Sequence, residues 1–196
     1  MDKLEQISEQ IRLNFDTQTA ARDQALTQAR LLTRHCSLAI RAVHREEIDL
    51  MQSHLDEAGK LAVSLTTDLD SFPNLYHTGY TQDALKEYAE AQITCALILN
   101  KPLPSPDEIH VIHATYLKGL SEVVGELRRR CLDILRKGYS DEAERLLKSM
   151  DDIFAILVTM DYPDAITNGL RRQTDIARSI IERTRGDMTF SLRGEH

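Results

Sequence analysis

Apolar residues recur three or four positions apart through most of the chain, which is the pattern of amphipathic α-helices. No alternating pattern long enough for a β-strand interrupts it. The pattern predicts seven helices, at about 2–14, 18–46, 47–70, 82–100, 106–137, 141–160 and 163–185. Because the connections between them are short, we expect residues 1–196 to form one all-α domain, an antiparallel bundle of about seven helices.

Local signals place several helix ends. Thr81 and Ser140 are expected to cap the fourth and sixth helices, since a hydroxyl can accept a hydrogen bond from a free backbone N–H. Gly138 is expected to end the fifth helix. Pro163 suits the first turn of the seventh helix, and Gly186 is expected to end it.

The fourth predicted helix carries a narrow polar stripe. Asp83, Glu87, Glu90 and Thr94 fall within an arc of about 60°, and apolar residues occupy most of the remaining surface. A buried carboxylate is costly unless it is paired or bound to a metal. The pattern alone leaves a solvated face and a buried metal site equally open for Glu87 and Glu90.

The fifth predicted helix carries a second pair, Glu122 and Glu126, which points away from the apolar face of that helix. The pattern here favours a solvated face, with Glu126 paired to Arg129 or Arg130. A divalent cation such as Mg²⁺ would favour carboxylates gathered at one place, because it prefers hard oxygen ligands. Spacing cannot show that the two pairs meet in space.

Composition and charge restrict the class of protein. The chain is 42% hydrophobic and 28% charged, and no apolar run approaches the roughly 20 residues that span a bilayer. With no apolar leader core near Met1, we expect a cytoplasmic protein with no membrane partner. The net charge of −7 argues against a surface that is basic throughout, but not against a local basic patch. Cys36, Cys95 and Cys131 lie in apolar stretches without metal-ligand spacing, so we expect buried, unreactive thiols.

Several blocks of sequence occur together in a recognisable order. They are Arg41-Ala42-Val43-His44-Arg45, the run 73–80, Glu87-Tyr88-Ala89-Glu90-Ala91, the run 116–120, Gly125-Glu126-Leu127-Arg128-Arg129, the run 161–163 and the run 182–187. On these blocks, which cover almost the whole chain, the sequence resembles the translin/TRAX family. The resemblance implies an all-α fold of seven helices, binding of single-stranded RNA and DNA, and assembly into hollow octamers.

Within that family, TRAX is the catalytic subunit of a Mg²⁺-dependent endoribonuclease and translin is its noncatalytic partner. The resemblance is to TRAX, because both of its acidic blocks have counterparts here. It implies that Glu87, Glu90, Glu122 and Glu126 are the catalytic residues and the ligands of Mg²⁺, or of Mn²⁺ as a substitute. Glu122 stands where the family usually has aspartate, which makes one ligand longer by a methylene.

Single-stranded RNA is therefore the expected substrate, with single-stranded DNA as a second candidate ligand. Arg41, His44, Arg45, Arg128 and Arg129 are candidates for holding its phosphates, since arginine offers paired donors. Ordinary structural roles compete for each of them, and His44 fits a packed histidine better than a general base.

We expect a homo-oligomer of six to eight subunits by analogy with the family, which leaves room for a translin-like partner subunit. Two other functions remain to be weighed. A noncatalytic oligomer that binds single-stranded RNA or DNA is the main alternative. A carboxylate-bridged di-iron bundle is disfavoured, because neither acidic pair has a histidine at the spacing that such sites use.

Overall fold

The computed structural model describes the backbone of residues 2–194 and the side chains of residues 2–192. Over this range the chain is all helical, with no strand. The helices are α1 (Asp2–His44), α2 (Ile48–Asp68), α3 (Pro73–Tyr76), α4 (Gly79–Ile98), α5 (His113–Leu135), α6 (Asp141–Thr159), α7 (Asp164–Thr167) and α8 (Leu170–Gly194). The predicted all-α class is confirmed.

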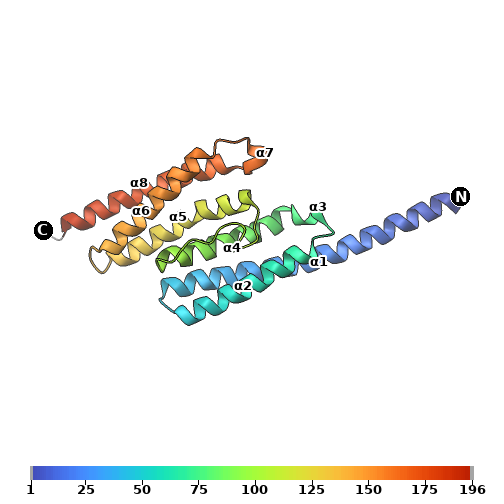
Figure 1. The fold of residues 1–196 in the computed structure, drawn as a ribbon, viewed down its shortest axis with the longest axis horizontal. Helices are drawn as coiled ribbons and strands as arrows, with labels where there is room; N and C mark the ends of the chain where they lie inside the picture. Colours follow the sequence, from blue (N-terminus) through green and yellow to red (C-terminus); the bar gives the residue numbers. More distant parts are fainter. Residues whose placement is uncertain (1, 195–196) are drawn as a thin grey trace.

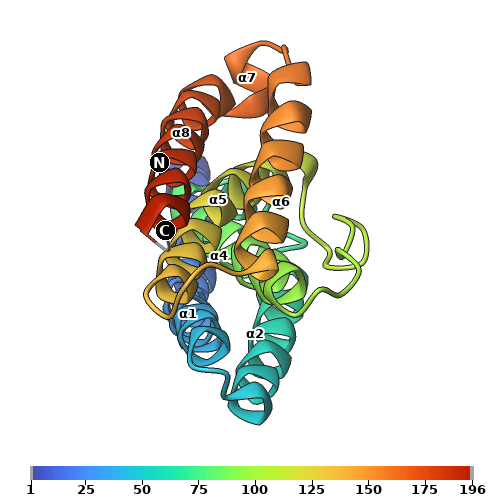
Figure 2. The same ribbon diagram turned by 90° about the vertical axis from the view of Figure 1, so that its left-hand side faces the viewer.

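The long helices form three stacked layers, α1 with α2, α4 with α5, and α6 with α8 (Figures 1 and 2). The middle layer is covered on one side by α1 and on the other by α6 and α8. Fully buried residues such as Leu32, Leu85, Val123 and Leu146 fill the spaces between the layers. The apolar character of nearly every face of α4 is thus explained by neighbours within the same chain.

The first two predicted helices form one continuous helix, α1, so the predicted break between them is wrong. Residues 15–17 contain neither glycine nor proline. Side chains also bridge this point, since Thr17 donates to the carbonyl of Leu13 at 2.8 Å and Gln18 donates to Asn14 at 2.7 Å. The N-terminal part of α1 extends beyond the bundle (Figure 1).

Two predicted helix starts are also wrong. The helix α4 begins at Gly79 with Thr78 as its N-cap, and Thr81 lies inside its first turn, where its hydroxyl donates to the carbonyl of Leu75 at 3.0 Å. The helix α5 begins at His113, because the preceding residues form a loop at the side of the bundle (Figure 2). Pro102, Pro104 and Pro106 lie in that loop and prevent regular helical hydrogen bonding.

The seventh predicted helix is divided into α7 and α8. Pro163 is the N-cap of α7 rather than part of its first turn, and the break follows at Asn168 and Gly169, which both have positive φ. The helix α8 continues through Gly186, contrary to the prediction. A glycine inside a helix costs only about 1 kcal/mol, which tertiary packing can offset.

The predicted cap of α6 at Ser140 is confirmed, while α5 ends at Leu135, two residues before the predicted end. Gly138 has a φ of 115°, a conformation that other residues adopt only with strain, and it follows the last turn of α5. Ser140 caps α6, with its side chain accepting a hydrogen bond from the backbone N–H of Glu142 at 3.1 Å.

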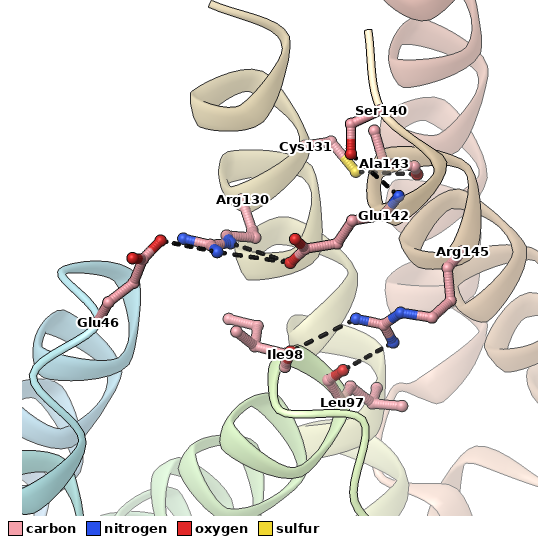
Figure 3. A network of polar contacts seen from close by, with 9 residues as sticks. All are labelled: Glu46, Leu97, Ile98, Arg130, Cys131, Ser140, Glu142, Ala143 and Arg145. Carbon is pink, nitrogen blue, oxygen red and sulfur yellow. Dashed lines mark hydrogen bonds and ion pairs between the residues drawn. The ribbon is translucent and has the colours of Figure 1, made fainter. Parts of the chain in front are cut away.

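A polar network fixes this end of the bundle (Figure 3). Arg130 of α5 lies 3.0 Å from Glu46 in the α1–α2 turn and 3.4 Å from Glu142 of α6. Arg145 of α6 donates to the carbonyl of Leu97 at 2.9 Å, where α4 leaves its last carbonyls without partners in the helix. The network therefore holds the C-terminal end of α4 and the adjoining ends of α1 and α5 in fixed positions.

Candidate metal centre

A glycine brings the two acidic helices into close contact. A Cβ atom added to Gly119 of α5 would lie 2.9 Å from the Cβ of Ala89 and 2.9 Å from the carbonyl oxygen of Lys86, both on α4. Such distances are too short for any larger residue without a shift of one helix. Gly119 thus allows α5 to pack on α4 one turn before Glu122, a role that sequence reasoning did not assign.

Three of the four predicted glutamates meet at this contact. Glu87 and Glu90 of α4 and Glu122 of α5 each offer a carboxylate oxygen, and these oxygens lie within 4.8 Å of one another. The side chain of Glu122 is 28% exposed and that of Glu87 is 29% exposed, while Glu90 is buried. The solvated face that the pattern favoured for Glu122 is therefore not what the structure shows.

The buried carboxyl group of Glu90 is unusually basic. Burial, followed by the negative charges of Glu87, Glu122 and Glu126, raises its pKa from 4.5 to about 8, and the positive charge of Lys86 opposes this effect. Glu90 therefore holds a proton at neutral pH when no divalent cation is bound. Binding of a cation would favour the charged form and release that proton.

Lys86 completes this group of charges. Its ammonium lies 2.6 Å from Glu122 and 3.1 Å from Glu87, and its side chain is only 14% exposed. Burial tends to lower the pKa of Lys86, but the hydrogen bonds to Glu122 and Glu87, together with the negative charges of these two residues, outweigh it and hold the pKa above its usual value. Sequence reasoning assigned no role to Lys86, and its position beside Glu87 gave only a weak signal.

The fourth predicted glutamate, Glu126, faces α1 instead. Its carboxylate lies 2.6 Å from Nε2 of His44 and 3.5 Å from Arg129. The hydrogen bond from His44 is the main cause that lowers the pKa of Glu126, although burial acts in the opposite direction. Glu126 is near enough for its charge to act on Glu90, but it is outside the group of three. Its role as a metal ligand stays a prediction.

The helix α1 closes the site from the other side. The side chain of His44 is only 2% exposed, as expected of a packed histidine. Further back along α1, burial and then the charges of Glu87 and Glu90 raise the pKa of the Cys36 thiol. All three cysteines are free and buried, and burial raises the pKa of Cys95 to about 12 and that of Cys131 to about 11. The prediction of buried thiols is confirmed.

The predicted phosphate-binding arginines fall into two groups. Arg41 and Arg45 are exposed at the end of α1 that carries His44. Arg129 is half exposed and its guanidinium lies near Glu126. Arg128 instead binds α8, with one nitrogen 3.1 Å from Thr184 and another 2.8 Å from Asp187. The contacts of Arg128 indicate a structural role, and RNA binding by any of these arginines stays a prediction.

The donor set of the site fits a hard divalent cation. Three carboxylates suit Mg²⁺ or Mn²⁺, which prefer oxygen ligands. The group contains no histidine among the residues that the structure describes, unlike the carboxylate-bridged di-iron sites of helical bundles.

No helix in the described range is long and apolar enough to cross a membrane.

Comparison with known proteins identifies relatives in sequence and in structure. No family model matches the chain. It is 33% identical over 171 residues to the uncharacterized protein MJ0175 of Methanocaldococcus jannaschii, an alignment that covers 86% of this chain and 75% of that protein.

Among solved structures, AfC3PO is 28% identical, with a TM-score of 0.86 over 95% of this chain and 97% of the other. AfC3PO in complex with duplex RNA gives a TM-score of 0.81 over 95% and 96%. The crystal structure of apo-NeC3PO, at 20% identity, shows the same fold with a TM-score of 0.86 over 93% and 96%. The chain therefore belongs to the same family as the M. jannaschii protein, and its fold is that of the translin-like C3PO proteins.

Proposed function

We propose that this protein is a metal-dependent endoribonuclease of the TRAX type, which acts on single-stranded RNA from within an oligomeric shell. The observation that carries the proposal is the convergence of Glu87, Glu90 and Glu122 from two helices to within 4.8 Å. Like charges repel at this distance, and burial of Glu90 adds to the cost. A divalent cation offsets both effects.

Each residue has a part in this proposal. A bound Mg²⁺ or Mn²⁺ would lower the pKa of a coordinated water and stabilise negative charge on the scissile phosphate. Glu87, Glu90 and Glu122 would hold the ion, and His44 with Arg129 would hold Glu126 beside them. Arg41 and Arg45 are exposed next to His44, where they are available to phosphates.

RNA is the ligand that the structural comparison favours. One of the similar structures is AfC3PO in complex with duplex RNA, and its likeness extends over 95% of this chain. Because that ligand is a duplex, both single-stranded and duplex RNA belong in any test of the substrate.

An apolar stripe on α1 supports assembly into a homo-oligomer, for which the family resemblance implies six to eight subunits. Leu4, Ile7, Ile11 and Phe15 follow one face of the helix, and between 48% and 71% of each is exposed. A stripe of this kind is costly in water and is typical of a contact surface.

A noncatalytic RNA-binding oligomer is the second candidate. The ion pairs of Lys86 with Glu87 and Glu122 favour it, because the single positive charge of the lysine offsets part of the negative charge of these two carboxylates without a metal. The two candidate functions therefore differ in whether a divalent metal ion replaces the ammonium of Lys86 beside the carboxylates.

Incubation of the purified protein with labelled single-stranded RNA separates these functions. We expect cleavage with Mg²⁺ or Mn²⁺, none with a chelator, and none by the Glu87→Gln, Glu90→Gln double variant. A matched control is Asp49→Asn with Asp56→Asn, which removes two exposed acids of α2 and should cleave normally. Cleavage that survives the chelator or the double variant contradicts the proposal, and binding of RNA without cleavage favours the second candidate.

A further inference from the structure

The ammonium of Lys86 occupies the position between carboxylates where a cation would bind. It lies 2.6 Å from an oxygen of Glu122 and 3.1 Å from an oxygen of Glu87. Mg²⁺ binds oxygens at about 2.0–2.1 Å and would need the same lone pairs. The ammonium and a divalent cation would compete for these two carboxylates, because repulsion between the two cations adds to the competition for oxygen.

The packing of α4 against α5 fixes the backbone position of Lys86. The carbonyl oxygen of Lys86 is one of the atoms that prevent a side chain at position 119, so the start of the lysine lies in the tightest part of the α4–α5 contact. The rest of the side chain is flexible and 14% exposed, which leaves a route to solvent. The lysine can therefore move its charge without a movement of either helix.

We propose that Lys86 is a positioning residue that acts as an internal competitor of the metal: it holds Glu87 and Glu122 together and leaves when a divalent cation binds. This inference rests on the metal site in the proposed function and adds a residue that sets how tightly the site binds its ion. The ion pairs of Lys86 hold the acidic residues of α4 and α5 together in the metal-free protein. The same ion pairs lower the affinity of the site for a divalent cation.

Metal affinity without RNA provides the test. Titration of metal-free protein with Mn²⁺ in a calorimeter should show that Lys86→Met binds about tenfold tighter than the wild type or better. Lys86→Arg keeps the charge and should bind within about threefold of the wild type. Lys148→Met removes the same charge from an exposed ion pair on α6 and should leave the affinity unchanged.

A second pair of variants is used because Lys86→Met leaves three acidic side chains together, which can destabilise the fold. The Glu90→Gln variant is therefore compared with the Lys86→Met, Glu90→Gln double variant, in which one of the three acids is absent. The same gain in affinity is expected there. Gains at Lys86→Met in both backgrounds support the inference.

Two failures are distinguishable. Wild-type protein that binds Mn²⁺ no more weakly than Lys86→Met overturns the competition but leaves the metal site in place. If neither the wild type nor any variant binds Mn²⁺, the proposed metal site is contradicted, and the inference about Lys86 is contradicted with it. Binding by Lys86→Met but not by the wild type supports the competition and overturns the metal-dependent activity of the wild type.

Discussion

At the scale of single residues, the site is a balance between burial and charge. Glu90 is buried, and its neighbours Glu87, Glu122 and Glu126 are acids, while Lys86 is the cation that opposes them. The sequence placed Glu87 and Glu90 on a narrow polar stripe and so raised the question of their burial. It could not show the contact of Lys86 with Glu122 or that of His44 with Glu126, because each of these contacts joins side chains of two different helices.

The raised pKa of Glu90 makes stability depend on pH. Between its ordinary pKa of 4.5 and its folded pKa of about 8, the folded protein holds a proton that the unfolded chain has released. The free energy of unfolding should therefore fall as pH rises through this window, by a few kcal/mol at about 1.4 kcal/mol per unit. Urea unfolding of metal-free protein from pH 5 to 9 measures this loss.

The variant Glu90→Gln isolates the effect of this carboxyl group. Its neutral amide cannot ionise, so the difference in stability between variant and wild type should shift in favour of the variant as pH rises. The exposed Glu9→Gln should show the wild-type dependence. A difference between Glu90→Gln and the wild type that does not change with pH contradicts the assignment.

His44 should contribute to stability through Glu126. Replacement by alanine removes a buried ring and the 2.6 Å hydrogen bond to the carboxylate, at a cost of about 2–3 kcal/mol in the free energy of unfolding. His113→Ala, at an exposed position, should cost less than about 0.5 kcal/mol. Equal thermal stability of the two variants would show that the His44–Glu126 contact does not hold the helices together.

At the scale of elements, the acidic site exists because α4 and α5 lie unusually close. Periodicity predicted both helices and the phase of their glutamates. It left the meeting of the two pairs undecided and favoured solvent for Glu122, because spacing describes one helix at a time. The contact at Gly119 supplies the missing relation, and only the packed structure shows what a larger side chain would meet there.

Two glycines on the same helix test this contact. Gly119→Ala should destabilise the protein by about 1–3 kcal/mol, because the new Cβ would force α5 away from α4. Gly125→Ala adds the same methyl group where nothing lies within 4 Å, and should be neutral or stabilising by up to about 1 kcal/mol. Chemical unfolding compares them, and a Gly119→Ala variant as stable as Gly125→Ala contradicts the close approach.

At the scale of the whole molecule, the sequence predicted the all-α bundle and most helix centres. It divided α1 wrongly, because polar residues interrupt the apolar pattern where the helix leaves the bundle. It also missed the break between α7 and α8, although Asn168-Gly169 is a pair that favours a turn with positive φ. The first error lies where α1 makes few tertiary contacts, and the second lies where the backbone conformation of two residues ends a helix.

The exposed stripe of α1 should contribute to assembly. Ile7→Glu with Ile11→Glu places two charges on it and should lower the molar mass measured by light scattering after gel filtration. Gln6→Glu with Gln10→Glu adds the same charge on another side of the helix and should leave the mass unchanged. If both double variants keep the wild-type mass, the stripe is not a subunit interface.

The proposed function requires that the acidic residues of α4 and α5 bind a divalent cation. A crystal structure of the protein soaked in Mn²⁺, with anomalous scattering recorded, tests it most directly. We expect an anomalous peak coordinated by oxygens of Glu87, Glu90 and Glu122, with the ammonium of Lys86 moved away from Glu87 and Glu122. No peak at this position, with Lys86 still bound to both carboxylates, would contradict it.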